Sequence, residues 1–282
     1  MNCQDQIYSE EYIDFIGNRS LIESKYTLDC KQPLGARFAS LYLKLSDGYE
    51  DGTVYGYYNI PKLFGLQDTG SMESSGILQV RENPYLKLDG SGVLIGFVDT
   101  GIDYAGSIFL KQDGTTRVTA IWDQTIPAGS PIRLPAQPEL PETPENITRT
   151  PEGFLYGSEF THEQLNAAVK MADAYEGISS RDEIGHGTFL ASIAAGNELP
   201  DGSFTGAAPK ADIAMVKLKP AKNRLRAYYQ IKEDAVAYQE NDIMAGVIYL
   251  VSLAKKRQQP LVICLGLGTN AGSHRGGLPL AR

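Results

Sequence analysis

The feature of the sequence that most constrains the fold is the run GVLIGFV at residues 92–98, which ends abruptly at Asp99. A strand buried on both faces has this pattern, because it needs apolar side chains at every position and not only at alternate ones. Similar apolar stretches follow at 117–122, 211–218 and 260–267. Helical patterns lie between them, so the sequence predicts an α/β fold built on a parallel sheet.

Three of the intervening segments predict helices. Residues 241–256 carry a one-sided apolar stripe, and residues 186–196 are rich in alanine and glycine. The sequence Thr161-His-Glu-Gln fits a capping box, which predicts a helix that begins there and continues through residue 174. His162 lies inside this box and is expected to be an exposed residue of the first helical turn.

Residues 1–85 form a separate compositional unit, for which we expect a small α+β module. Residues 10–22 place apolar side chains at helical spacing, and residues 59–66 predict a short helix with a proline in its first turn. Residues 38–46 and 75–81 predict strands. The main body is then expected over 86–282, with a proline-rich insertion at about 124–160.

Composition narrows the set of partners. The net charge is −8, whereas phosphate binding needs a basic face, so nucleic acid is not expected as a partner. No apolar run reaches the roughly 18 residues that span a bilayer, so no membrane partner is expected either. The N-terminus shows no classical signal peptide, which favours the cytoplasm. Cys3, Cys30 and Cys264 are too few and too scattered to predict a disulfide framework or a metal site.

Asp99 is the first candidate for chemistry, because the carboxyl ends of strands in an open α/β sheet are where sites form. Taken alone, Asp99-Thr-Gly leaves three interpretations open. It could orient a catalytic histidine, it could be half of a carboxylate pair that shares a proton, or it could end a strand and cap a helix.

His186 favours the first interpretation. Gly185 and Gly187 flank it and would let backbone or substrate approach the imidazole ring closely. A helix N-terminus disfavours the imidazolium form, so a general base placed there needs a carboxylate to orient it and to stabilise its charged form. Asp99 is the candidate for that carboxylate.

Three segments now resemble the subtilase family of serine proteases. Residues 92–103 resemble the segment of the catalytic Asp, 185–196 that of the catalytic His, and 206–217 the turn and buried strand that follow. The resemblance covers residues 92 to about 270. It implies a subtilisin-like parallel sheet with flanking helices, incomplete in this chain, and cleavage of polypeptide substrates by an Asp-His-Ser triad. Asp99 and His186 would be catalytic.

The resemblance also implies a role for the first 85 residues, as a prodomain-like module that assists folding and whose end enters the active-site cleft. The separation of 87 positions from Asp99 to His186, with the filler around Trp122, makes the chain most similar to the Csp-type subtilases of clostridia, some of which act in spore germination. Localisation is therefore expected to be cytoplasmic or spore-associated. No cofactor is assigned, and calcium is allowed by the resemblance alone.

The chain departs from the family pattern at two positions. Ser192 replaces a glycine of the His segment, and Gly266 replaces the serine of a Ser-Leu-Gly sequence. The second stretch resembles the edge that pairs with a peptide substrate through main-chain hydrogen bonds, which makes Gly266, Leu267 and Gly268 candidate substrate-binding residues. Glycine keeps the N–H and C=O groups, so this pairing is expected to survive.

The nucleophilic serine is missing. Gly-Thr occurs at 52, 114, 187 and 268, and none of these pairs continues to serine. Since the family order is Asp, His, Ser, the serine is expected beyond Arg282, and this chain alone is predicted to be inactive, with the missing C-terminal half as a partner. Residues 261–267 are expected to form a central buried strand and not an edge, because they lack the charge or proline that protects edges.

Two other functions stay open. The chain could be a non-catalytic pseudoprotease with a binding or signalling role, as in spore germination, although Asp99 and His186 are both intact. An aspartic protease would need a second Asp-Thr/Ser-Gly or a homodimer, and it would leave His186 without a purpose.

Overall fold

The computed structural model describes residues 2–20, 30–44, 59–66, 88–135, 147–201 and 204–269. Its centre is a five-stranded sheet in the order β10-β5-β8-β6-β7. The strands are β5 (Leu94–Asp99), β6 (Val118–Asp123), β7 (Ser158–Thr161), β8 (Asp212–Lys217) and β10 (Leu261–Cys264). Neighbouring strands are parallel except for β7, which runs antiparallel to β6. The predicted α/β class with a parallel sheet is confirmed.

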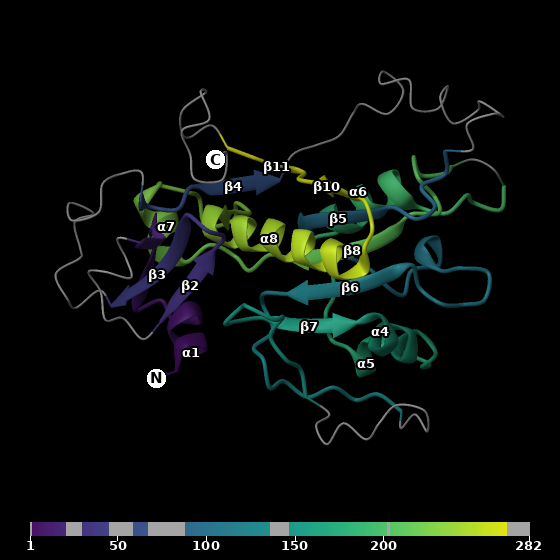
Figure 1. Cartoon of the computed structure of the whole chain (residues 1–282), viewed down its shortest axis with the longest axis horizontal. Coiled ribbons are helices and arrows are strands. Elements are labelled where there is room, and N and C mark those ends of the chain that lie inside the picture. The colour runs from purple at the N-terminus through teal and green to yellow at the C-terminus, as the bar shows by residue number, and fades with distance from the viewer. Residues whose placement is uncertain are drawn as a thin grey trace.

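Helices cover both faces of this sheet (Figure 1). The helices are α1 (Cys3–Tyr8), α4 (His162–Val169), α5 (Ala174–Gly177), α6 (His186–Ala195), α7 (Asn223–Tyr228) and α8 (Glu240–Arg257), with a 3-10 turn at Ser107–Phe109. Helix α8 packs on one face in a cluster with Leu94 and Val98, whereas α4 and α6 pack on the other in a cluster with Ile95 and Phe97. Both helices predicted at 186–196 and 241–256 are confirmed.

The pleat of β5 decides where Asp99 points. Successive side chains of a strand alternate between faces, so Asp99 lies on the same face as Ile95 and Phe97. That face is the one covered by α6. Close contact on the opposite face is set by Gly96, where an added Cβ would lie 2.7 Å from a methyl carbon of Leu250 in α8.

The N-terminal residues form a second, antiparallel sheet of order β1-β3-β2. Its strands are β1 (Tyr12–Asn18), β2 (Lys31–Leu34) and β3 (Phe38–Lys44). The next strand, β4 (Leu63–Leu66), lies between β9 (Tyr238–Gln239) and β11 (Leu267–Gly268) in a third sheet. Figure 1 shows β4 running beside β11, so the N-terminal part of the chain adds a strand to the body.

Two N-terminal predictions were wrong. Residues 12–18 form a strand and not a helix, because they pair with β3 along their whole length and bury Asp14, Phe15 and Ile16 in succession. This burial on both sides hides the period-two pattern. The short helix expected at 59–66 is also absent, since the main chain of β4 pairs with β9 and β11 instead. The strand expected at 38–46 is confirmed over Phe38–Lys44, whereas residues 45–46 and the strand expected at 75–81 lie outside the described residues.

Three further expectations need correction. Cys3 and Cys30 form a disulfide, because two cysteines 27 residues apart are enough for a single bridge even without a framework. The capping box at Thr161 is present, but α4 ends at Val169, and His162 is partly buried with its Nδ1 3.1 Å from the Val118 carbonyl oxygen. Strand β10 is at an edge of the described sheet and not in its centre.

The domain boundaries at 85/86 and the insertion at 124–160 stay predictions. Within the described ranges, no helix combines the length and the apolar character that a bilayer crossing requires.

Candidate active site

Asp99 and His186 meet at the carboxyl end of β5. Asp99 is the last residue of that strand and His186 is the first residue of α6. The His186 Nδ1 lies 2.8 Å from the Asp99 Oδ1, although the two residues are 87 positions apart in the sequence. Since a carboxylate can only accept, Nδ1 carries the proton of this hydrogen bond, and acid–base chemistry falls to Nε2.

The Asp99 carboxyl is almost completely buried, at 1% exposure. Its Oδ1 also accepts a hydrogen bond from the Thr100 amide at 2.7 Å, and its Oδ2 has no hydrogen-bond partner among the described residues. Burial raises the pKa of Asp99 above its usual value, and the hydrogen bonds from His186 and Thr100 oppose that shift. The protonated imidazolium form of His186 would stabilise the Asp99 carboxylate further.

The two glycines beside His186 have different roles. Gly185 has φ +88°, a left-handed conformation that glycine adopts without strain, and it starts the helix there. Gly187 is needed for close approach, because an added Cβ would lie 2.2 Å from the Gly101 carbonyl oxygen and 3.2 Å from the Asp99 Cβ. The close approach of α6 to the end of β5 that the sequence predicts therefore depends on the small size of Gly187. Gly185 contributes its backbone conformation instead.

Asp182 is a part of the site to which the sequence pattern gave no role. Its carboxylate accepts hydrogen bonds from the Thr100 hydroxyl and from the amide and hydroxyl of Thr188. These bonds connect the residue after Asp99 to the first turn of α6. A signal was available, because an aspartate just before a helix is a capping residue, but the pattern could not show that Thr100 shares it.

Lys217 anchors the other side of the segment that leads to His186. It ends β8 and is the direct neighbour of Asp99 in the parallel register. Its ammonium group lies 2.6 Å from both the Arg181 carbonyl oxygen and the Glu183 carboxylate. The segment 181–183 is therefore fixed from two sides. Lys217 bonds to Arg181 and Glu183. Between these two residues in the sequence, Asp182 bonds to Thr100 and Thr188.

Gly266, the first of the three predicted substrate-binding residues, lies directly beside this pair. An added Cβ at Gly266 would be 3.1 Å from the His186 Cε1, 3.2 Å from the Asp99 Oδ2 and 2.2 Å from the Cδ1 of Leu190. Leu190 therefore fills the space that a side chain at position 266 would need. Leu267 and Gly268 form β11, whose antiparallel partners in β4 are Leu66 and Gly65.

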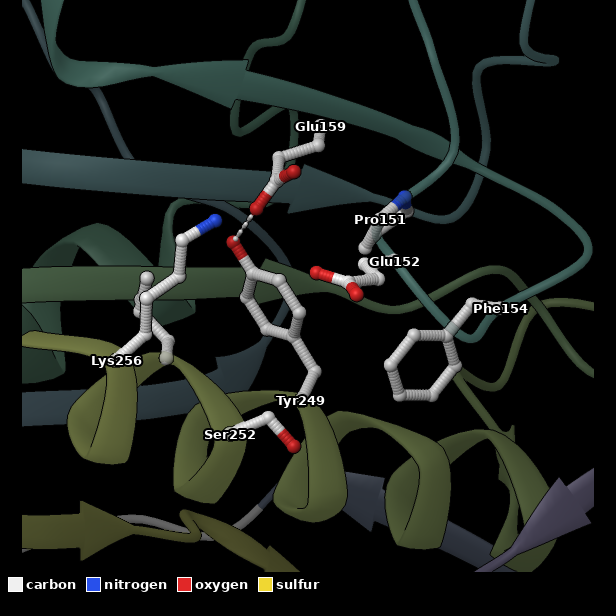
Figure 2. A pocket seen from close by; sticks show the side chains of 8 residues that line it. Pro151, Glu152, Phe154, Glu159, Tyr249, Ser252 and Lys256 are labelled. Carbon is white, nitrogen blue, oxygen red and sulfur yellow. Dashed lines mark hydrogen bonds between the residues drawn. The ribbon is translucent and has the colours of Figure 1, made fainter.

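A separate pocket of about 570 Å³ lies between α8 and β7 (Figure 2). Its walls include Phe154, Lys256 and Tyr249, whose hydroxyl donates to the Glu159 carboxylate at 2.8 Å. Neither Asp99 nor His186 lines it, and Tyr249 belongs to the core cluster on the α8 face. The pocket is thus on the face of the sheet opposite to the Asp99–His186 pair.

Among the described residues, no cluster of metal ligands lies at the site. Across the part of the chain that the structure describes, no three His, Cys, Asp or Glu side chains converge on a position suited to a metal ion. The calcium that the family resemblance allows has no ligands assigned in these ranges.

Known proteins of similar sequence and structure are subtilisin-like proteases and a clostridial protease. The structure resembles that of the Clostridium perfringens CspB protease, with a TM-score of 0.54, 30% sequence identity, and coverage of 74% of this chain and 36% of that one. Two subtilisin-like proteases of Arabidopsis thaliana are also similar. SBT3.5 is 29% identical over 61% of this chain and 22% of its own length, and SBT3.8 is 30% identical over 45% and 16%.

This chain therefore spans about a fifth of the length of these plant relatives. The family model of the subtilases, Peptidase_S8, matches residues 90–279, which contain β5, α6 and β11. The chain belongs to the subtilase family.

Proposed function

We propose that this chain is part of a serine-type endopeptidase in which Asp99 orients His186 and His186 is the general base. The observation that carries the proposal is the 2.8 Å hydrogen bond between the His186 Nδ1 and the buried Asp99 Oδ1. His186 Nε2 would take the proton of a serine hydroxyl as the oxygen attacks the peptide carbonyl, and would then give that proton to the leaving amine.

The substrate is proposed to be an extended polypeptide that pairs with β9 and β11. The position of β4 supports this, because β4 is an extended segment in antiparallel pairing with both strands. The segment is held at its start by Glu240, whose carboxylate accepts from the Lys62 amide and whose amide donates to the Lys62 carbonyl oxygen. We propose that residues 1–85 act as a prodomain that fills the substrate groove with β4.

The 282-residue chain alone is proposed to be inactive. It contains no Gly-Thr-Ser sequence, and in subtilisin the removal of the nucleophilic serine lowers kcat by about 10⁶. The proposed serine would come from the C-terminal half of the catalytic domain.

The experiment compares this chain with a longer polypeptide that includes the sequence encoded after the Arg282 codon. A fluorophosphonate probe should label the longer polypeptide and not the shorter one, and only the longer one should hydrolyse casein. In the longer polypeptide His186→Ala should lower kcat by about 10⁶ and Asp99→Asn by roughly 10⁴, the losses known for such triads. His162→Gln, a histidine substitution outside the site, should leave kcat unchanged.

Two results would overturn the proposal. One is labelling of the 282-residue chain. The other is a longer polypeptide that contains Gly-Thr-Ser yet neither reacts with the probe nor cleaves casein, which would favour the non-catalytic pseudoprotease.

A further inference from the structure

The Asp182 carboxylate is partly exposed and accepts five hydrogen bonds. Its Oδ1 accepts from the Thr100 hydroxyl at 2.8 Å, the Gly185 amide at 2.8 Å and the Ile184 amide at 3.3 Å. Its Oδ2 accepts from the Thr188 amide at 2.8 Å and the Thr188 hydroxyl at 2.7 Å. One carboxylate therefore holds the residues on both sides of His186.

The same donors continue the connection to the Asp99 side. The Thr100 hydroxyl, which donates to Asp182, accepts from the Gly187 amide at 2.8 Å. The Thr188 hydroxyl, which also donates to Asp182, accepts from the Asp103 amide at 3.0 Å. Each hydroxyl thus links the loop after β5 to the first turn of α6, and Asp182 fixes the orientation of both hydroxyls.

Asp182 also performs the capping that the N-cap residue of α6 cannot. Gly185 has no side chain to accept from the first amides of the helix. Asp182 supplies that acceptor at the Gly185 and Thr188 amides and places a negative charge at the positive end of the helix. Burial raises the pKa of Asp182, but the hydrogen bonds from Thr188, Gly185 and Thr100 outweigh it, and the net shift is downward.

We propose that Asp182 is a positioning residue that fixes the His186 imidazole against Asp99 by joining Thr100 to the first turn of α6. Its importance for catalysis rests on the proposed peptidase function. The hydrogen bond that it would maintain is a property of this chain and can be measured without activity.

The test uses the 282-residue chain with ¹⁵N-labelled histidine and follows the His186 Nδ1–H by NMR. The sequence has three histidines, so His186→Ala assigns the signal. Asp182→Asn should make this proton exchange with water roughly 10- to 100-fold faster, the range expected for loss of one charge-assisted hydrogen bond. The His162 ring bonds to the Val118 carbonyl oxygen and to the Asn166 side chain, and neither of these residues bonds to Asp182, so His162 is an internal reference and should not change.

Two further variants separate positioning from a general loss of stability. Glu183→Gln removes the same charge from the next residue of the segment, whose bond is to Lys217 and not to Thr100 or Thr188. Lys217 keeps its 2.6 Å bond to the Arg181 carbonyl oxygen in this variant, so the segment stays anchored and His186 exchange should not change. Thr100→Val keeps Asp182 but removes the hydroxyl that joins it to the Asp99 side, and should accelerate exchange as Asp182→Asn does.

The proposal would be overturned if Asp182→Asn folds and its His186 exchange is unchanged. If Asp182→Asn does not fold, unchanged His186 exchange in Thr100→Val would overturn it instead. Equal acceleration in Glu183→Gln would also overturn it, because the effect would then come from charge alone. Since the readout is the His186–Asp99 hydrogen bond itself, a failure of the proposed peptidase activity would not change the outcome.

Discussion

The attachment of the N-terminal sheet to the body should depend strongly on one buried ion pair. Asp14 of β1 is fully buried, and its Oδ1 lies 2.5 Å from the ammonium nitrogen of Lys222, which is 4% exposed. The Asp14 Oδ2 accepts from the Gln239 side chain at 2.9 Å and the Asn241 side chain at 3.1 Å. The perturbation is Asp14→Asn, which removes the charge and keeps the size.

The expected cost follows from the three donors that surround Asp14. An asparagine has one accepting oxygen, and its amide would have to face one of these donors, so at least one buried hydrogen bond is lost. Lys222 would also keep a buried charge, with the Tyr12 carbonyl oxygen as its remaining acceptor. Breaking a buried pair in this way costs about 3–5 kcal/mol of unfolding free energy.

Urea unfolding measures this cost. Fluorescence of Trp122, the single tryptophan, reports the body, and hydrogen exchange of β1 and β3 amides reports the N-terminal sheet. The matched control is Glu11→Gln, which breaks the exposed 3.9 Å contact between Glu11 and Lys44 and should cost less than about 1 kcal/mol. A cost for Asp14→Asn as small as that of the control would refute the reasoning.

Three other perturbations have defined outcomes. Gly266→Ala should lower the unfolding free energy in urea by about 1–3 kcal/mol, because the new Cβ overlaps Leu190. Adding Leu190→Val to the same chain should restore part of that free energy, and purely additive losses in the double variant would contradict the overlap. The pKa of Asp182 is lowered in the folded state, so the stability that its carboxylate contributes is complete above its usual pKa of 3.8 and is lost as the pH falls below that value. The difference in melting temperature between the unaltered chain and Asp182→Asn should therefore shrink from pH 6 to pH 3, and a constant difference would contradict the lowered pKa. Replacing Cys3 and Cys30 together by serine should lower the unfolding free energy by roughly 3–4 kcal/mol, because the unfolded chain gains the entropy of a loop of this length. Denaturation without reductant measures the loss, and equal stabilities of the two chains would argue against the bridge.

The sequence predicted the body of the fold better than its N-terminal part, for a physical reason. Strands β5 and β8 are buried on both faces and helix α8 packs one side against the sheet, so each shows its environment in its own composition. Strand β1 instead buries Asp14 beside two apolar residues, so its acidic side chain imitates the polar side of a helix in the sequence pattern. Strand β4 forms through partners about 170 and 200 residues away, which no local pattern contains.

The candidate site shows the same division. The glycines around His186 and the apolar run before Asp99 are local signals, and they are sufficient to predict which two residues meet. The network of Asp182, Thr100 and Thr188 depends on side-chain hydroxyls whose partners lie across two segments. Threonines in such positions have no distinctive spacing, so their contribution becomes visible with the three-dimensional arrangement.

The partner of Asp99 is set by the face of the sheet on which Asp99 lies. Because Ile95 and Phe97 face α6, Asp99 faces α6 too, and its partner has to come from the N-terminal end of that helix. A proton-sharing carboxylate pair would need a second carboxyl within hydrogen-bond distance. The hydrogen bonds that Asp99 makes among the described residues go instead to the Thr100 amide and the His186 imidazole. The same Asp-Thr-Gly sequence thus has the contacts of the proposed orienting acid in this chain, since the pleat of β5 gives it a histidine and not another aspartate.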